Sequence, residues 1–344
     1  MRQLIIGEGQ IGQELIAAAL GRGDDVTVLR RSAVSDTDTR ARYGAHICAE
    51  SGDDQILRIQ GDTTDPDTLD RALRAGGGAD VIQATFHAPY DSRVWRRTLP
   101  AAEATVLDAA ARADLPVVFP ESMYPFLRTA ADVHEGDPFA PGEAKGEIRV
   151  DLITARRAHP ATTVSVVAAD LIGPTSVGTW GSVINATVIE PLAAGQRPFL
   201  TGALSAEHSL THIPDLAAAM LVAGDHAAEL RQDGLDAVVH APTAPAHTLR
   251  AVVDQVTEQL GARRRRLVAM PRPLLRLAGL AQRSMYEIAA IGDLWYRDCR
   301  LHAGVVTTSY GLQPTDWAAA LDASITAAAS GQTNPIGLTG SAVS

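Results

Sequence analysis

The chain has 344 residues, of which 46% are hydrophobic and 20% are charged, and its formal net charge is −10. This composition is typical of a globular protein, and the length allows one large domain or two closely joined ones. The acidic balance argues against a nucleic-acid partner and against an anionic membrane as a partner.

The first predicted elements are a buried strand at residues 4–6 and a helix that runs to Leu20 and ends at Gly21. Between them the glycines follow the pattern G-x-G-x-x-G. Such glycines provide a tight turn, let the backbone approach a pyrophosphate, and allow close packing of helix on strand. The helix N-terminus adds N–H groups and partial positive charge. The predicted phosphate-binding residues are Gly7, Gly9, Gln10, Ile11 and Gly12.

A second strand is predicted at residues 25–29 and is followed by Arg30 and Arg31. In a dinucleotide-binding fold an acidic residue at this position holds the ribose 2′-hydroxyl, whereas an arginine accommodates a 2′-phosphate. No carboxylate competes at the end of this strand. The pattern therefore favours NADP over NAD, with two solvated arginines as the alternative.

Strands and helices then alternate along the chain. Strands are predicted at 56–60, 80–85, 115–119 and 162–168, and helices at 69–73, 100–113 and 143–158. This alternation predicts an α/β fold with a Rossmann-type, doubly wound parallel sheet. Ligands of such sheets bind beyond the carboxyl ends of the strands, so residues at and after Thr85 and Phe119 are site candidates.

Beyond residue 174 the pattern becomes irregular. A helix is expected within 178–194, another from 210–215 to residue 221, a late strand at 238–240, and helices at 248–260 and 316–329. The predicted division is a Rossmann domain at 1–174 plus 213–245, a smaller substrate-capping region at 175–212 plus 246–330, and a flexible tail at 331–344.

Lysine usage singles out one position. Of the 30 basic residues only Lys145 is a lysine, and the others are arginines. An ammonium group is a compact charge whose pKa burial can shift, unlike that of a guanidinium. The alternative is a stray surface lysine.

Several motifs together resemble the extended short-chain dehydrogenases/reductases, in particular their atypical NAD-dependent epimerase-like members. Besides the glycine motif, they are Gly61-Asp62, Pro120-x-Ser122-x-Tyr124, Lys145-Gly146-x-x-Arg149, Gly173-Pro174, His212-Ile213-x-Asp215 and Tyr310-Gly311-x-x-Pro314. The resemblance implies that Asp62 lies at the adenine and that Lys145 holds the nicotinamide ribose. It also implies that an upstream hydroxyl, best matched by Ser122, binds the substrate oxygen.

The chain departs from this family at the catalytic tyrosine, because the position four residues before Lys145 is Pro141. Three replacements stay open. Tyr124 could supply the phenol, with Lys145 stabilising its phenolate. Tyr90 could supply it instead, or Lys145 could act as the acid/base itself. Glu121 is expected to be a solvated loop carboxylate.

The resemblance implies an NADP-dependent oxidoreductase or epimerase that acts at a carbonyl or carbinol carbon of a small molecule. The alternative is a non-catalytic NADP(H)-binding redox sensor. His208 and His212 are four residues apart, but Pro214 and the strand-like residues 210–213 argue against a helical ligand pair, so no metal site is predicted. Two cysteines and no signal peptide predict the cytoplasm. A homodimer through helices 100–113 and 143–158 is also expected.

Overall fold

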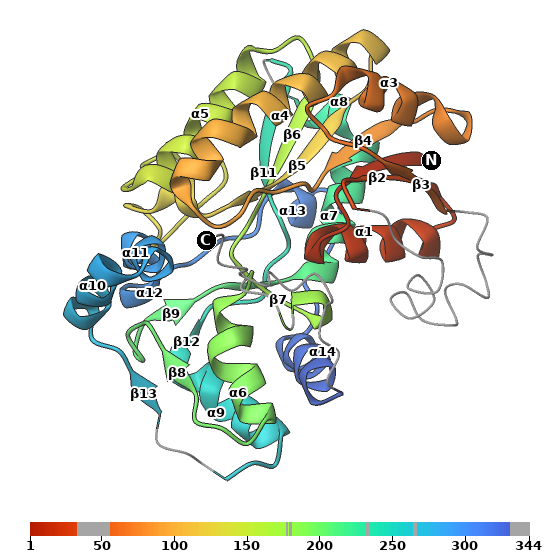
Figure 1. Ribbon diagram of the computed structural model, residues 1–344. Coiled ribbons are helices and arrows are strands. Elements are labelled where there is room, and N and C mark those ends of the chain that lie inside the picture. The colour runs from red at the N-terminus through yellow and green to blue at the C-terminus, as the bar shows by residue number, and fades with distance from the viewer. Residues whose placement is uncertain (33–55, 177, 179–180, 232–233, 264–266, 331–344) are drawn as a thin grey trace.

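The computed structural model describes residues 1–32, 56–176, 178, 181–231, 234–263 and 267–330 (Figure 1). Seven parallel strands form the main sheet, in the order β11-β6-β5-β4-β1-β2-β3. The strands are β1 (Arg2–Ile6), β2 (Asp25–Arg30), β3 (Ile56–Gln60), β4 (Val81–Ala84), β5 (Val117–Ser122), β6 (Thr163–Ala168) and β11 (Asp236–His240). This strand order confirms the predicted Rossmann-type sheet.

Helices cover both faces of the sheet, which explains why its strands are apolar without alternation. They are α1 (Gln10–Gly21), α3 (Pro66–Arg74), α4 (Ser92–Ala113), α5 (Ala144–Ala158), α7 (Ile213–Asp225) and α8 (Ala227–Leu230). In β1, Ile5 packs in one core cluster with side chains of α1 and α7. Leu4 and Ile6 point to the other face and pack with side chains of α3 and α4.

Two predicted boundaries are wrong. The helix expected at 100–113 begins at Ser92, because the side chain of Asp91 caps it by accepting a hydrogen bond from the backbone N–H of Arg93 (2.8 Å). Pro100 therefore lies inside this helix. The helix expected from residue 210 begins at Ile213, because residues 210–212 pair with a parallel strand instead.

The rest of the chain forms short elements that gather beyond one end of the main sheet (Figure 1). The strands are β7 (Asp170–Ile172), β8 (Phe199–Leu200), β9 (Glu207–His208), β10 (Leu210–His212), β12 (His247–Thr248) and β13 (Val268–Ala269). The helices are α6 (Glu190–Ala193), α9 (Leu249–Gln259), α10 (Arg272–Ala281), α11 (Arg283–Ala290), α12 (Asp293–Tyr296), α13 (Val305–Thr308) and α14 (Trp317–Ala329). In the described ranges, no helix is both long and apolar enough to cross a membrane. The predicted tail at 331–344 lies outside the described residues.

Candidate active site

The glycine loop between β1 and α1 leaves room for a phosphate. Gly7 has a φ of +104°, and a Cβ on Gly12 would lie 2.1 Å from the carbonyl oxygen of Gly7, so the protein's own packing excludes side chains at both positions. A Cβ on Gly9, in contrast, would meet no atom within 4 Å. No side chain caps α1, which begins with Gln10 and Ile11. The loop thus fits the pyrophosphate of a nicotinamide dinucleotide.

Arginines surround a buried carboxylate at the end of β2. Arg30 forms an ion pair with Glu8 of the glycine loop, and Arg58 on β3 places its Nη2 3.5 Å from the same carboxylate. Glu8 is buried, whereas both guanidinium groups remain partly exposed. Among the described residues, two positive charges therefore share one negative charge where the sequence predicts a 2′-phosphate site. The expectation that no carboxylate competes at this strand end is wrong, because the glycine loop brings Glu8 there.

Two other predicted cofactor residues, Asp62 and Thr85, follow strands of the main sheet. Asp62 follows β3, and Thr64 donates to its carboxylate from its backbone N–H (2.9 Å) and its hydroxyl (2.8 Å). These bonds, aided by the charge of Arg31, hold the pKa of Asp62 below its usual value. Thr85 follows β4 and donates to the carbonyl of Gly7 (2.8 Å), which fixes the loop to this strand end.

Two tyrosines meet beyond the carboxyl ends of β4 and β5. The hydroxyl oxygens of Tyr90 and Tyr124 are 3.0 Å apart. Burial raises the pKa of Tyr124 well above its usual value of 10, and burial together with the neighbouring phenol does the same for Tyr90. Solvent still reaches Tyr90, which is 38% exposed. Both phenols are therefore neutral at pH 7, and a phenolate is not the resting form of Tyr124.

Lys145 lies in the first turn of α5, where the side chain of Glu143 caps the helix. It is fully buried and forms an ion pair with Glu287 of α11, whose backbone carbonyl also accepts from Nζ (3.1 Å). Nζ also lies 4.7 Å from the ring centroid of Tyr90. The lysine is therefore not a stray surface residue, and its ammonium faces Glu287 and the ring of Tyr90.

Glu121 is not solvated, which corrects the expectation from the sequence. Its side chain is buried, with Oε1 3.4 Å from Nε of Arg149 and Oε2 3.4 Å from Nη1 of Arg156. The backbone N–H of Ser122 donates to Oε1 (2.8 Å), and the Ser122 hydroxyl lies 3.3 Å from the same atom. These arginines compensate the charge of Glu121, and its carboxylate positions the Ser122 hydroxyl.

Asp170 follows β6 and begins β7, at the same edge of the sheet as the tyrosines. Burial raises the pKa of its carboxyl group to about 7, although backbone hydrogen bonds from Leu171, Val183 and Ile184 offset part of the effect. Its Oδ2 has no hydrogen-bond partner among the described residues. The charge of Asp170 is also one of the causes that raise the pKa of Tyr124. A carboxyl group with this pKa can give and take protons at neutral pH.

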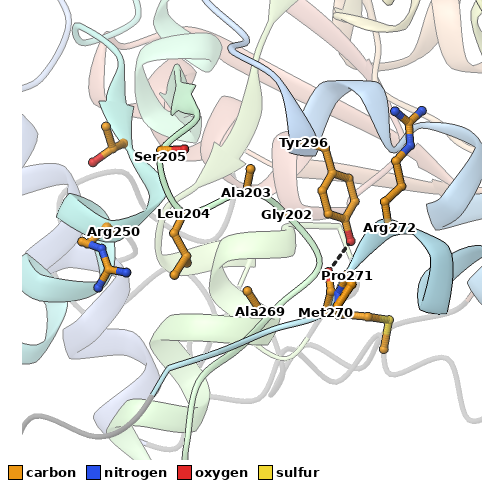
Figure 2. A pocket seen from close by; sticks show the side chains of 11 residues that line it. Gly202, Ala203, Leu204, Ser205, Arg250, Ala269, Met270, Pro271, Arg272 and Tyr296 are labelled. Atoms are coloured by element: carbon orange, nitrogen blue, oxygen red, sulfur yellow. Dashed lines mark hydrogen bonds between the residues drawn. The ribbon is translucent and has the colours of Figure 1, made fainter.

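An open cavity of about 800 Å³ lies in the C-terminal part of the chain (Figure 2). Tyr296 lines it and donates from its hydroxyl to the carbonyl of Met270 (2.6 Å), while Trp295 is buried. The other lining residues are Gly202, Ala203, Leu204, Ser205, Thr248, Arg250, Ala269, Pro271 and Arg272. These residues come from the short elements after β7 and their loops, and none of them is a residue of the strand-end site.

The fold brings Asp132, His134 and His302 together on the surface, where their candidate ligand atoms lie within 4.8 Å of one another. The two imidazole rings are stacked, with centroids 4.0 Å apart and planes 6° apart, and His302 hydrogen-bonds to Asp132 (2.6 Å). Parallel rings do not direct their nitrogen lone pairs at one point, so this geometry does not suit a single ion. The predicted absence of a metal stays a prediction.

Sequence reasoning missed Glu8, Arg58, Asp170 and Glu287 as site residues. Asp170 was predictable as a site residue, because it follows a predicted strand, and ligands of parallel sheets bind beyond the carboxyl ends of the strands. Glu287 gave no signal, since 142 residues separate it from Lys145.

The family model described as NAD dependent epimerase/dehydratase family matches residues 4–239. No curated protein sequence gives a significant match. Among solved structures, the Bordetella bronchiseptica enzyme WbmG in complex with NAD and UDP is 18% identical, with a TM-score of 0.69 over 97% of this chain and 96% of that one.

Two further solved structures have similar folds. The UDP-glucose 4-epimerase of Thermotoga maritima, solved with UDP-glucose, is 12% identical, with a TM-score of 0.70 over 95% of this chain and 98% of that one. The dTDP-glucose 4,6-dehydratase of Bacillus anthracis, solved with NAD, is 14% identical, with a TM-score of 0.73 over 96% and 97% of the two chains. At these identities the likeness is one of fold.

Proposed function

The chain belongs to the NAD dependent epimerase/dehydratase family, and from this premise we propose that it is an NADP-dependent oxidoreductase or epimerase acting at a carbonyl or carbinol carbon. Of the three similar structures, one was solved with UDP and one with UDP-glucose, and the third is a dTDP-glucose 4,6-dehydratase. Nucleoside-diphosphate sugars are therefore the first substrate class to test, followed by simple carbonyl compounds.

The observation that carries this proposal is the tyrosine pair beyond the ends of β4 and β5 (Tyr90 and Tyr124, 3.0 Å between oxygens). Two neutral phenols can donate hydrogen bonds to a substrate oxygen and stabilise the charge that develops on it. Asp170 lies at the same edge of the sheet, and its pKa of about 7 suits it to exchange a proton with a substrate bound there. Together these residues replace the tyrosine that Pro141 removes. A bound nicotinamide would supply the hydride chemistry, and Lys145 would support its ribose side.

Replacing Tyr124 by phenylalanine is expected to lower kcat by about a hundred-fold or more, because one proton donor is lost while the ring packing stays. Tyr90→Phe should have a smaller effect, because Tyr124 keeps its own hydroxyl. NADPH oxidation with carbonyl compounds, and epimerisation of nucleoside-diphosphate sugars, would be measured for both variants.

Tyr310→Phe is the matched control, since the Tyr310 hydroxyl bonds Glu229 and should leave kcat unchanged. Full activity in Tyr124→Phe would exclude the proposed role of the pair. Tight NADPH binding without turnover of any compound would favour the redox sensor over the enzyme.

The NADP preference rests on Arg30 and Arg58, which share the Glu8 carboxylate. Arg30→Ala should weaken NADPH binding by about ten-fold or more and leave NADH binding nearly unchanged, because only NADPH carries a 2′-phosphate. Glu8→Gln should act in the opposite direction, because it removes a negative charge next to that phosphate. Fluorescence titration of the three proteins with both nucleotides would test this. Tighter binding of NADH than of NADPH by the wild type would contradict the preference.

A further inference from the structure

Large apolar side chains are exposed on α10 and α11. Leu274, Leu277 and Leu280 lie at spacings of three along α10, and their exposed fractions are 55%, 63% and 84%. Tyr286 on α11 is 48% exposed. Leu275 is the one residue of α10 that the structure describes as buried. Figure 1 shows this helix at the periphery of the molecule, beside α11 and α12.

The same stretch is strongly basic, although the chain as a whole is acidic. Between Glu258 and Glu287 the sequence contains no acidic residue, and its arginines are Arg263, Arg264, Arg265, Arg266, Arg272, Arg276 and Arg283. Arg272 pairs with Asp293, and Arg283 pairs with Asp91 and Glu287. Arg276 is exposed and forms no ion pair within the described part of the chain, so its charge is available beside the leucines.

We propose that α10 docks this chain on an anionic membrane surface, with Leu274, Leu277 and Leu280 entering the interface and Arg276 contacting lipid phosphates. A short helix with exposed leucines and arginines is typical of segments that lie in the plane of a bilayer surface. Charge complementarity selects anionic lipid, because Arg276, which has no carboxylate partner among the described residues, is attracted to the negative surface of such a membrane.

The net charge of −10 does not oppose this docking. Screening limits electrostatic interactions to about 8–10 Å at ordinary salt, so the charge near α10 decides the interaction and acidic residues elsewhere contribute little. Taken alone, the net charge of the whole chain argues against a membrane partner. That total does not reveal the excess of arginines in the one stretch around α10. Nucleic acid would engage the arginines but would leave the leucine stripe exposed to water.

Co-sedimentation with lipid vesicles tests the proposal. The wild type should bind vesicles that contain about 30% anionic phosphatidylglycerol and should bind pure phosphatidylcholine much more weakly. Leu277→Ser/Leu280→Ser should lower the partition coefficient by about ten-fold or more, because two apolar side chains no longer enter the interface. Arg276→Glu should reduce binding to the anionic vesicles only.

Leu57→Ser is the matched control, because Leu57 is 42% exposed on β3, outside the docking helix. It should bind as the wild type does, and all variants should keep the wild-type unfolding midpoint. Three results would overturn the proposal: no sedimentation of the wild type with anionic vesicles, unchanged binding by the leucine double variant, or a lipid-free dimer that this double variant dissociates. The last result would assign the face to a second copy of the chain.

Discussion

An Asp170→Asn variant should unfold at a higher urea concentration than the wild type at pH 8, yet turn over substrate at least about a hundred-fold more slowly. Both expectations follow from one property of this residue. Its carboxyl group is enclosed at the end of β6, where Oδ2 has no hydrogen-bond partner among the described residues. Burial raises the pKa of Asp170 from 3.8 to about 7.

The stability change has a defined sign. In the unfolded chain Asp170 loses its proton near pH 3.8, whereas in the folded protein it holds that proton until about pH 7. The stabilising contribution of the protonated group is therefore complete below pH 3.8 and is lost as the pH rises to 7. Asparagine is neutral at every pH. The variant's gain in the free energy of unfolding over the wild type should therefore be greatest above pH 7, at most roughly 4 kcal/mol, and smaller at pH 5.

Glu135→Gln is the matched control for this experiment. Burial also raises the pKa of Glu135, and backbone N–H groups of His240 and Val305 donate to its carboxylate. A glutamine side chain can accept from only one of these two N–H groups, so Glu135→Gln should leave kcat unchanged without the stability gain expected of Asp170→Asn. The wild-type pH profile should show an ionisation near pH 7 that Asp170→Asn removes. An Asp170→Asn variant with normal turnover and that same profile would exclude Asp170 as the proton-exchanging group.

The predictable parts of the fold are those determined by residues close together in the sequence. Gly7 and Gly12 are fixed by a turn within six residues, and the strand beginning at Arg2 is recognisable because both of its faces are buried. Pro100 misled the prediction of a helix start, since proline favours the first turn of a helix. The capping contact from Asp91 to Arg93 was the stronger determinant.

The candidate site was only partly predictable, because it depends on contacts between distant segments. Tyr90 and Tyr124 were found separately, from their places after two strands, and the parallel sheet brings their hydroxyls together. The surroundings of Lys145 could not be predicted, since Glu287 comes from a helix in the irregular C-terminal part. Glu121 was misjudged for the same reason, because Arg149 and Arg156 reach it from α5.

Breaking the pair between Lys145 and Glu287 should destabilise the protein by about 2 kcal/mol, because either substitution removes the shortest charged contact of the other group. Arg283 still pairs with Glu287, and Glu143 lies 3.8 Å from Lys145, so neither charge is left wholly without a partner. Both side chains are almost completely buried. Burial alone would raise the pKa of Glu287, but hydrogen bonds from Lys145 and Ser92 hold it below the usual value. The stabilisation from this carboxylate is therefore present above pH 4.5 and is lost as the pH falls through its lowered pKa.

Lys145→Met, Glu287→Gln and the double variant form a cycle that separates the two charges. Glutamine keeps an acceptor for Ser92 while it removes the negative charge. Urea unfolding at pH 7.5 should show that the double variant regains much of the stability lost in each single variant, with a coupling of about 1–3 kcal/mol. If the stability loss of the double variant equals the sum of the losses of the two single variants, Lys145 and Glu287 are not coupled.

Cofactor affinity in the same double variant decides what Lys145 does. If the lysine contacts the nicotinamide ribose, NADPH binding should stay at least about ten-fold weaker than in the wild type even where stability is regained, because no other side chain replaces the ammonium. If Lys145 only connects α5 to α11, the NADPH affinity of the double variant should recover together with its stability. We expect the first result, since Lys145 is the single ammonium in a chain of arginines and lies 4.7 Å from the ring of Tyr90, at the edge of the sheet where the cofactor would bind.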